Sequence, residues 1–205
     1  MQIEEKSINN MSRKATFAMK LDSAFIIKTS VVYCVLSVGF SFVGLLVPEK
    51  APQPNPLSAF SIQEVTGHII WGLVVGAASF SIRYCLLSGS FALLIDSDHL
   101  IGLLQTDALS RMSHSILFGI ISILILMILF GKKNYLLGAI AVGGLLAHLS
   151  YDMFVGGDGM FPLFTPFYNE MIRFPHTDWI FLEIAAIVIV GFIAVLNKYN
   201  LKKTN

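Results

Sequence analysis

Charged residues and cysteines are scarce in this chain of 205 residues. Only 13% of its residues are charged, about half the share of an ordinary soluble domain, whereas 55% are hydrophobic. The two cysteines, Cys34 and Cys85, lie in apolar runs and form no Cys-x-x-Cys pair, which excludes a disulfide framework and a thiolate metal site. Basic residues (14) nearly balance acidic ones (13), so no overall field attracts nucleic acid. This composition disfavours a soluble enzyme and is typical of a compact polytopic membrane protein.

Apolar runs occupy most of the chain, and most of them are long enough to cross a bilayer. A spanning helix needs about 20 mostly apolar residues. The third run is the weakest, because only its part from Tyr84 to Ile95 is free of charge, and we expect a short or re-entrant helix there. The sequence thus predicts an all-α, polytopic membrane helical bundle with about six membrane-embedded helices. The runs lie at 24–47, 66–82, 84–104, 114–131, 134–155 and 179–197.

Lysine and arginine set the orientation of these helices. With six crossings, 11 of the 14 basic residues fall on the side of the two termini, and only Lys50, Arg111 and Arg173 fall on the other. We therefore expect a multi-pass protein of the plasma (inner) membrane with both termini cytoplasmic. The predicted segments are a basic cytoplasmic tail at 1–22, a signal-anchor helix with a proline-rich connector at 23–63, a membrane-embedded domain at 64–197 and a basic cytoplasmic tail at 198–205.

All histidines of the chain fall on the predicted outer side, although histidine played no part in choosing the orientation. The level of these residues along their helices also agrees, near the outer edge of the hydrocarbon core. This coincidence predicts one shared site that faces outward. The histidines are His68, His99, His114, His148 and His176.

The densest polar group is Asp96-Ser97-Asp98-His99, at the outer end of the third run. Two carboxylates and an imidazole beside hydrocarbon need compensation, which a divalent cation would supply. The alternative is a helix end that meets water at the outer interface. The stretch by itself leaves both interpretations open.

Two further helices carry histidine on a patterned face. His148 and Asp152 are four residues apart, so a helix projects both from one side, as two ligands of one metal or as a carboxylate that orients a histidine. A structural hydrogen bond between them is the alternative. His68 begins the second run, and Gly72 and Gly76 continue its face as a stripe that would seat another helix closely. A lone histidine at a helix end is more often structural, but this one shares its level with the others.

Arg111 lies three residues before His114 at the start of the fourth run, where Ser110 or Ser113 could cap the helix. A guanidinium group is suited to hold an oxyanion or phosphate through two parallel hydrogen bonds. Its alternative role is an anchor at the membrane interface, which is the commoner role of an isolated arginine.

The last outer loop also carries ionisable residues. His176 and Asp178 close this loop, and Glu183 lies about one turn into the final helix. We expect these three side chains to support the metal ligands from behind, although Glu183 could also bind the metal, pair with Arg173 or stay neutral. The segment 160–174 is rich in aromatic residues and proline and predicts an interfacial flap.

Taken in order, these motifs resemble the YdjM-like family of membrane-bound, metal-dependent hydrolases, also described as LexA-binding, inner-membrane-associated hydrolases. The resemblance implies a divalent metal, hydrolysis and an association with LexA at the cytoplasmic surface. The family is remotely similar to the zinc-dependent phospholipase C group, which implies phosphoester chemistry by analogy. The matching elements, within residues 64–170, are Gly67-His68, Ile95-Asp96-Ser97-Asp98-His99, Ser113-His114-Ser115 with Arg111 nearby, Ala147-His148-Leu149-Ser150-Tyr151-Asp152, Gly156-Gly157-Asp158-Gly159 and Pro166-Phe167.

The leading hypothesis is an integral membrane hydrolase with a metal centre on the outer side. Mixed imidazole and carboxylate ligands suit zinc best, with manganese or iron also compatible. One or two ions are expected, and such an ion would lower the pKa of a bound water to about 7. Arg111 and Asp98 are the predicted catalytic residues, with Arg111 stabilising the charged intermediate. The predicted metal ligands are His68, Asp96, Asp98, His99, His114, His148 and Asp152.

The expected substrate is a lipid or a lipid-linked phosphoester, because the site would lie at the headgroup level beneath an aromatic flap. Two alternatives without turnover stay open: a membrane protein that binds metal ions, or one that binds a protein partner on its cytoplasmic surface. The inner halves of the last three helices are almost wholly apolar, which argues against a permeation path but not against a structural metal.

Overall fold

The computed structural model describes residues 2–47, 60–105, 109, 111–156, 159–168 and 170–203. The proline-rich connector, Ser110 and the Gly157-Asp158 part of the glycine-rich turn lie outside these residues. The described part is helical apart from one short ribbon of two strands, which confirms the predicted all-α class. The helices are α1 (Gln2–Ser41), α2 (Ile62–Ala77), α3 (Ile82–Leu94), α4 (Ile116–Phe130), α5 (Tyr135–Gly156) and α6 (Trp179–Lys203).

In the part of the chain that the structure describes, four 3-10 segments and the ribbon lie between the helices. The ribbon pairs β1 (Gly159–Phe161) with β2 (Ile172–Phe174) in antiparallel register. It lies in the segment predicted as an interfacial flap, and Phe164 and Phe167 between the two strands are exposed. The 3-10 segments are η1 (Phe42–Leu46), η3 (Ile95–Leu104), η4 (Met112–His114) and η5 (His176–Asp178).

Among the described residues, four helical stretches are long and apolar enough to cross a membrane, at Asp22–Leu46, Ile82–Leu104, Tyr135–Gly156 and His176–Asn200. The predicted count of six is not confirmed, because α2 has 16 residues and α4 has 15, which is short for a complete span. The weak third run is among the four stretches, since α3 continues into η3. The first helix is longer than predicted, because α1 begins at Gln2 and includes most of the segment predicted as a tail.

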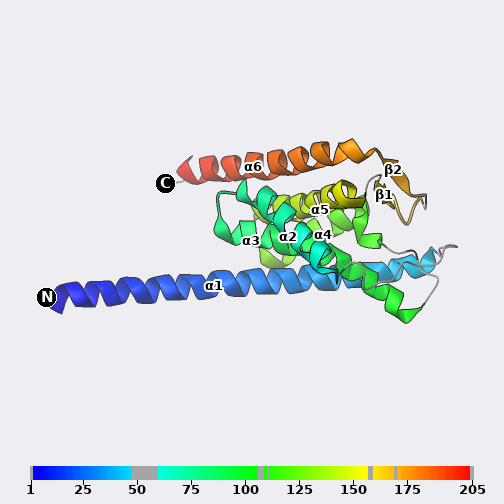
Figure 1. Ribbon diagram of the computed structural model, residues 1–205. Coiled ribbons are helices and arrows are strands. Elements are labelled where there is room, and N and C mark those ends of the chain that lie inside the picture. The colour runs from blue at the N-terminus through cyan, green and yellow to red at the C-terminus, as the bar shows by residue number, and fades with distance from the viewer. Residues whose placement is uncertain are drawn as a thin grey trace.

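The helices form a bundle in which α1 and α6 lie on opposite outer sides, with the other helices between them (Figure 1). Both ends of the chain lie at one end of this bundle, and the ribbon lies at the other. Hydrogen bonds connect the helices at the end near the termini. The guanidinium of Arg83 donates to Asp22 over 3.1 Å, and the hydroxyl of Tyr84 donates to Asn134 over 3.0 Å. We call this the terminal end of the bundle, and we call the opposite end the ribbon end.

Glycines allow α2 and α3 to approach closely, as the stripe after His68 predicted. A Cβ atom on Gly72 would lie 2.6 Å from the carbonyl oxygen of Ser88, and one on Gly76 would lie 2.7 Å from the Cα of Cys85. Neither position has room for a larger residue unless the helices separate. The close seam fixes the height of α2 beside α3, and thereby the height of His68 beside the end of α3.

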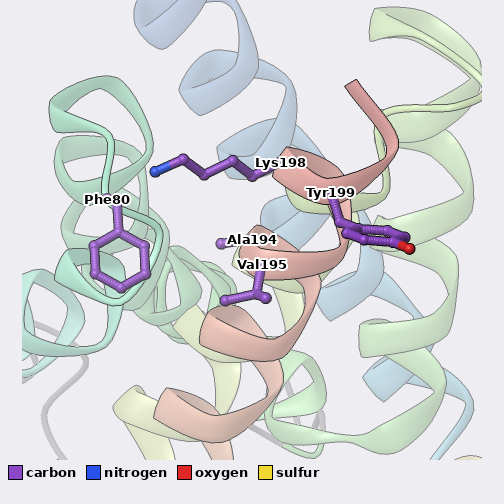
Figure 2. Close-up of a pocket in the computed structure, with 5 residues that line it drawn as sticks. All are labelled: Phe80, Ala194, Val195, Lys198 and Tyr199. Carbon is purple, nitrogen blue, oxygen red and sulfur yellow. The ribbon is translucent and has the colours of Figure 1, made fainter. Parts of the chain in front are cut away.

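A groove of about 370 Å³ opens at the terminal end, between the turn after α2 and the last turns of α6 (Figure 2). Phe80 is largely exposed on that turn, and the side chain of Lys198 extends from α6 toward it. Ala194, Val195 and Tyr199 complete the lining, so the groove is apolar with one ammonium group.

Candidate metal centre

At the ribbon end, α2 positions the first imidazole of a buried cluster. The helix begins at a capping motif in which the hydroxyl of Ser61 accepts the N–H of Glu64. His68 follows one turn later, and its Nδ1 donates to the carbonyl of Glu64 over 2.9 Å. Since a carbonyl oxygen only accepts hydrogen bonds, Nδ1 holds a proton. The Nε2 atom therefore points the other way, 3.1 Å from a carboxylate oxygen of Asp152.

The tight winding of η3 gathers the acidic motif into the same cluster. A 3-10 helix has three residues per turn, so Asp96 and His99 share a face, with His99 Nε2 3.5 Å from Asp96 Oδ1. Helix α1 holds this segment from outside, because the hydroxyl of Ser37 donates to the carbonyl of Ile95 over 2.6 Å. Both aspartates of the motif, Asp96 and Asp98, are buried.

The residues before α4 place His114 against this motif. Arg111 adopts a left-handed conformation with φ of 63°, which turns the chain into η4. The cap of α4 is Ser115, whose hydroxyl accepts the N–H of Phe118, so the prediction of Ser113 as the cap is wrong. Ser113 instead donates its backbone N–H to Asp98 Oδ2 over 2.8 Å. The same oxygen lies 3.3 Å from Nδ1 of His114, on the far side of that ring from the cluster centre.

The centre of the cluster is a pair of imidazoles that face each other. His148, on α5, donates from Nδ1 to the carbonyl of Ala92 over 2.7 Å, and His114 donates from Nδ1 to the Asp98 carboxylate. In the neutral rings both Nε2 atoms therefore carry lone pairs. These two atoms are only 2.8 Å apart. Such an arrangement is repulsive unless a proton or a cation lies between the lone pairs.

Two carboxylates complete the surroundings of this position. Asp96 Oδ1 lies 3.5 Å from Nε2 of His148 and 3.8 Å from Nε2 of His114. Asp152 Oδ2 lies 3.7 Å and 3.6 Å from the same two atoms. Two overlapping groups of three ligand atoms result, with His148 common to both. One contains His68, His148 and Asp152, and the other contains Asp96, His114 and His148.

The carboxylates of the cluster would favour a cation. Asp96 and Asp98 are buried and the side chain of Asp152 is only 9% exposed, while Arg111 forms a 3.2 Å ion pair with Asp152. Carboxylates gathered in a buried place are costly unless a cation or a proton compensates them. The donor set of imidazole nitrogens and carboxylate oxygens suits zinc or manganese.

Two buried polar atoms beside the cluster make no hydrogen bond within the described part of the chain. They are Oδ1 of Asp98 and Nε2 of His99, and they lie 3.9 Å apart. Asp96 Oδ1 is near the same histidine atom, at 3.5 Å. Unsatisfied buried atoms of this kind call for an ion or a water. Neither atom belongs to the two groups of ligand atoms described above, so the second ion stays a prediction.

Of the seven predicted ligands, the structure brings five into these two overlapping groups of three, and it leaves Asp98 and His99 outside both groups. The three predicted supporting residues lie further along the ribbon end. His176 is exposed, and its Nδ1 donates to the carbonyl of Met153 over 2.8 Å. Asp178 lies in η5, and Glu183 is buried on α6 with an Oε2 that makes no hydrogen bond among the described residues. Their supporting role stays a prediction.

The sequence interpretation missed several groups that hold the cluster in place. The ring of Tyr151 packs edge-on against His68 with centroids 4.7 Å apart, and its hydroxyl donates to the carbonyl of Gln63. Phe161 lies parallel to His114 at 6.1 Å. The position of Tyr151 beside Asp152 could have indicated its role in the sequence. The carbonyls of Glu64 and Ala92 could not have been predicted, because every residue has a backbone carbonyl.

No protein-family model, curated protein or solved structure matches the chain. The likeness to the YdjM-like family therefore stays a prediction that rests on the motifs. The fold and the site together define a class: a helical protein with helices able to cross a membrane and a buried imidazole–carboxylate cluster able to hold a metal ion.

Proposed function

We propose that the protein is an integral membrane, metal-dependent hydrolase. The supporting observation is the pair of Nε2 atoms of His114 and His148, 2.8 Å apart with both Nδ1 protons committed elsewhere. Asp96 and Asp152 flank this position, and His68 adds a third imidazole to the cluster. A bound zinc ion, or manganese or iron in its place, would supply Lewis acidity and lower the pKa of a coordinated water.

The remaining polar residues have distinct roles in this proposal. Asp98 accepts a hydrogen bond from Nδ1 of His114 and so favours the tautomer whose Nε2 carries the lone pair that a metal would use. Arg111 is the group placed to bind an anionic substrate, because its side chain is about one-third exposed (34%) while its Nη2 contacts Asp152. An ester or phosphoester oxygen beside this guanidinium would be stabilised as negative charge develops. His99 and the free Oδ1 of Asp98 would take part in a second ion site.

The proposed setting is the inner membrane, with six embedded helices, both termini in the cytoplasm and the metal centre facing outward. The arrangement of polar groups supports this topology. Arg83 and the Lys132-Lys133 turn belong to the terminal end, whereas the histidine cluster lies at the ribbon end. Basic residues remain on the cytoplasmic side of membrane proteins. A phosphoester at the headgroup level is the proposed substrate class.

The test is elemental analysis of the detergent-purified protein beside a double variant, His148→Ala with Asp152→Ala. We expect one or two equivalents of zinc or manganese in the wild type and loss of that metal in the double variant. The wild type would also hydrolyse a chromogenic phosphodiester such as bis(p-nitrophenyl) phosphate, and a chelator would stop it. Asp22→Ala is the matched control, because it removes the carboxylate that pairs with Arg83 at the terminal end.

A wild type that holds no metal, even after reloading with zinc and manganese, would overturn the proposal. The histidine cluster would then be a hydrogen-bonded structural cap in which one imidazole shares its proton with the next. Metal without hydrolysis of any ester or phosphoester tested would instead identify a metal-binding membrane protein.

A further inference from the structure

An apolar cavity of about 190 Å³ lies directly beside the proposed metal centre. His114 and the ribbon residue Phe161 are among the residues that line it. Leu145 and Leu149 of α5 and Leu182 of α6 also belong to the lining. A cavity of roughly 150 Å³ with such a lining binds a benzene-sized apolar ligand, so this one has room for a segment of hydrocarbon chain.

The cavity lies where a membrane lipid could enter from the side. Helices α4 and α6 each pack against α5 but share few contacts with each other in the described part of the chain. Both helices expose apolar residues, among them Ile120 of α4 and Phe181 of α6. In a bilayer, acyl chains would surround these residues. A chain that enters between α4 and α6 would meet a cavity lining that is apolar apart from His114 and Ser115.

We propose that this cavity binds an acyl chain of a membrane lipid and thereby positions the polar end of that lipid at the metal centre. The inference rests on the proposed function and specifies its substrate class. His114 supports it, because this residue lines the cavity and also presents Nε2 to the cation position. Arg111 also lies near Phe161, with its guanidinium carbon 5.9 Å from the centre of that ring, and this guanidinium would bind a headgroup phosphate.

The test is photolabelling of the full chain in vesicles of phosphatidylethanolamine and phosphatidylglycerol, with a trace of phosphatidylglycerol that carries a diazirine in the middle of one acyl chain. Labelled residues are identified by mass spectrometry. Bulk lipid labels exposed positions such as Ile120 and Phe181. The inference predicts additional label on Leu149 and Phe161, which line the cavity and are only 5% and 0% exposed.

Filling the cavity supplies the decisive comparison. Leu182→Trp should lower the label on Leu149 and Phe161 by about tenfold, because exclusion of roughly two methylene groups weakens binding by that factor. Leu196→Trp is the matched control on the same helix, since Leu196 is 40% exposed and lies outside the cavity. Label at Ile120 reports that a variant is still folded in the bilayer. If Leu182→Trp loses this label, Leu146→Phe, which fills the cavity from α5, is used in its place.

Absence of label on Leu149 and Phe161 in the wild type would overturn the inference, and so would undiminished label in the filled variants. Photolabelling needs neither metal nor turnover. Label that the filled variants lose therefore supports the acyl-chain site even in a sample without metal. The metal content of the same sample reports separately on the proposed hydrolase.

Discussion

An arginine–aspartate ion pair lies at each end of the bundle, and these two pairs have nearly the same length. At the terminal end Arg83 contacts Asp22 over 3.1 Å, and at the ribbon end Arg111 contacts Asp152 over 3.2 Å. The arginines are similarly exposed, but the side chain of Asp22 is 47% exposed and that of Asp152 only 9%. An exposed pair contributes little to stability, whereas a buried carboxylate needs complete compensation.

The neighbours of the two pairs differ more than the pairs themselves. Around Arg83 lie the rings of Phe25 and Tyr84, and the groove at this end is apolar apart from Lys198 (Figure 2). Around Asp152 lie three imidazoles and a second carboxylate. An ion pair alone therefore says little about function. The imidazoles that converge on one buried position distinguish the ribbon end.

The largest expected effect comes from removing the carboxylate of each pair in turn. Asp152→Asn should abolish the rise in melting temperature that zinc produces, because a ligand of the proposed ion is lost. Asp22→Asn should keep that rise. Metal at about 1,000 times its Kd stabilises a protein by roughly 4 kcal/mol, which is measurable by thermal unfolding in detergent. An equal zinc response in both variants would show that the two ends do not differ in this way.

A second comparison replaces the two arginines by lysine. Arg111→Lys should lower the hydrolytic rate by about 100-fold while the metal content stays the same, because lysine cannot offer the planar, two-pronged contact to a charged oxygen. Arg83→Lys should leave the rate unchanged. The measurement is kcat with a chromogenic phosphodiester beside elemental analysis. Loss of metal in Arg111→Lys would mean that this arginine acts mainly by holding Asp152.

A third comparison removes one hydrogen bond from each end. Asp98→Asn keeps the size of the side chain but loses the charge that fixes the proton on Nδ1 of His114. Loss of such a supporting group typically weakens metal affinity by about 10- to 100-fold. Tyr84→Phe removes the hydrogen bond to Asn134 at the terminal end and should leave affinity unchanged. Titration calorimetry with zinc measures both, and an unchanged affinity in Asp98→Asn would contradict the orienting role.

Much of the ribbon end could be predicted from the sequence because its signals are local. The spacing of His148 and Asp152 and the density of Asp96-Ser97-Asp98-His99 each indicate a shared face or turn. The distribution of lysine and arginine then orients the helices, and this orientation puts both motifs at the same depth in the membrane. The helix count was harder, because apolar runs do not show where a helix begins: α2 begins at Ile62, before its apolar run, and remains short.

The division of labour among the ligands could not be predicted, because it depends on contacts between distant segments. Asp96 and Asp98 look equivalent in the sequence. In the structure, Asp98 accepts hydrogen bonds from Ser113 and His114, whereas Asp96 faces the cluster centre. The cap of α4 illustrates the same difficulty. Ser113 and Ser115 are both residue types that cap helices. Ser113 donates its backbone N–H to the buried carboxylate of Asp98, and Ser115 caps the helix.

The smallest expected effect concerns the glycine seam that links the two ends. His68, Gly72, Gly76 and Phe80 follow at four-residue spacing along α2 and its end, from the cluster to the groove of Figure 2. Added Cβ atoms on the two glycines would meet α3 at nearly equal distances, 2.6 Å for Gly72 and 2.7 Å for Gly76. Each alanine variant should therefore lose a similar stability, about 1–3 kcal/mol.

The two glycine variants should differ only in metal binding. Gly72 lies one turn from His68, so Gly72→Ala would displace α2 close to this ligand. We expect zinc affinity to fall by about threefold, which is less than the loss of a whole ligand would cause, because a packed interior transmits such shifts over short distances. Gly76→Ala displaces the helix two turns away, nearer the terminal end, and should leave affinity unchanged. Thermal unfolding and zinc titration of both variants separate the two effects. Equal weakening of zinc affinity would mean that α2 moves as one rigid rod, so that the metal centre depends on packing at both ends.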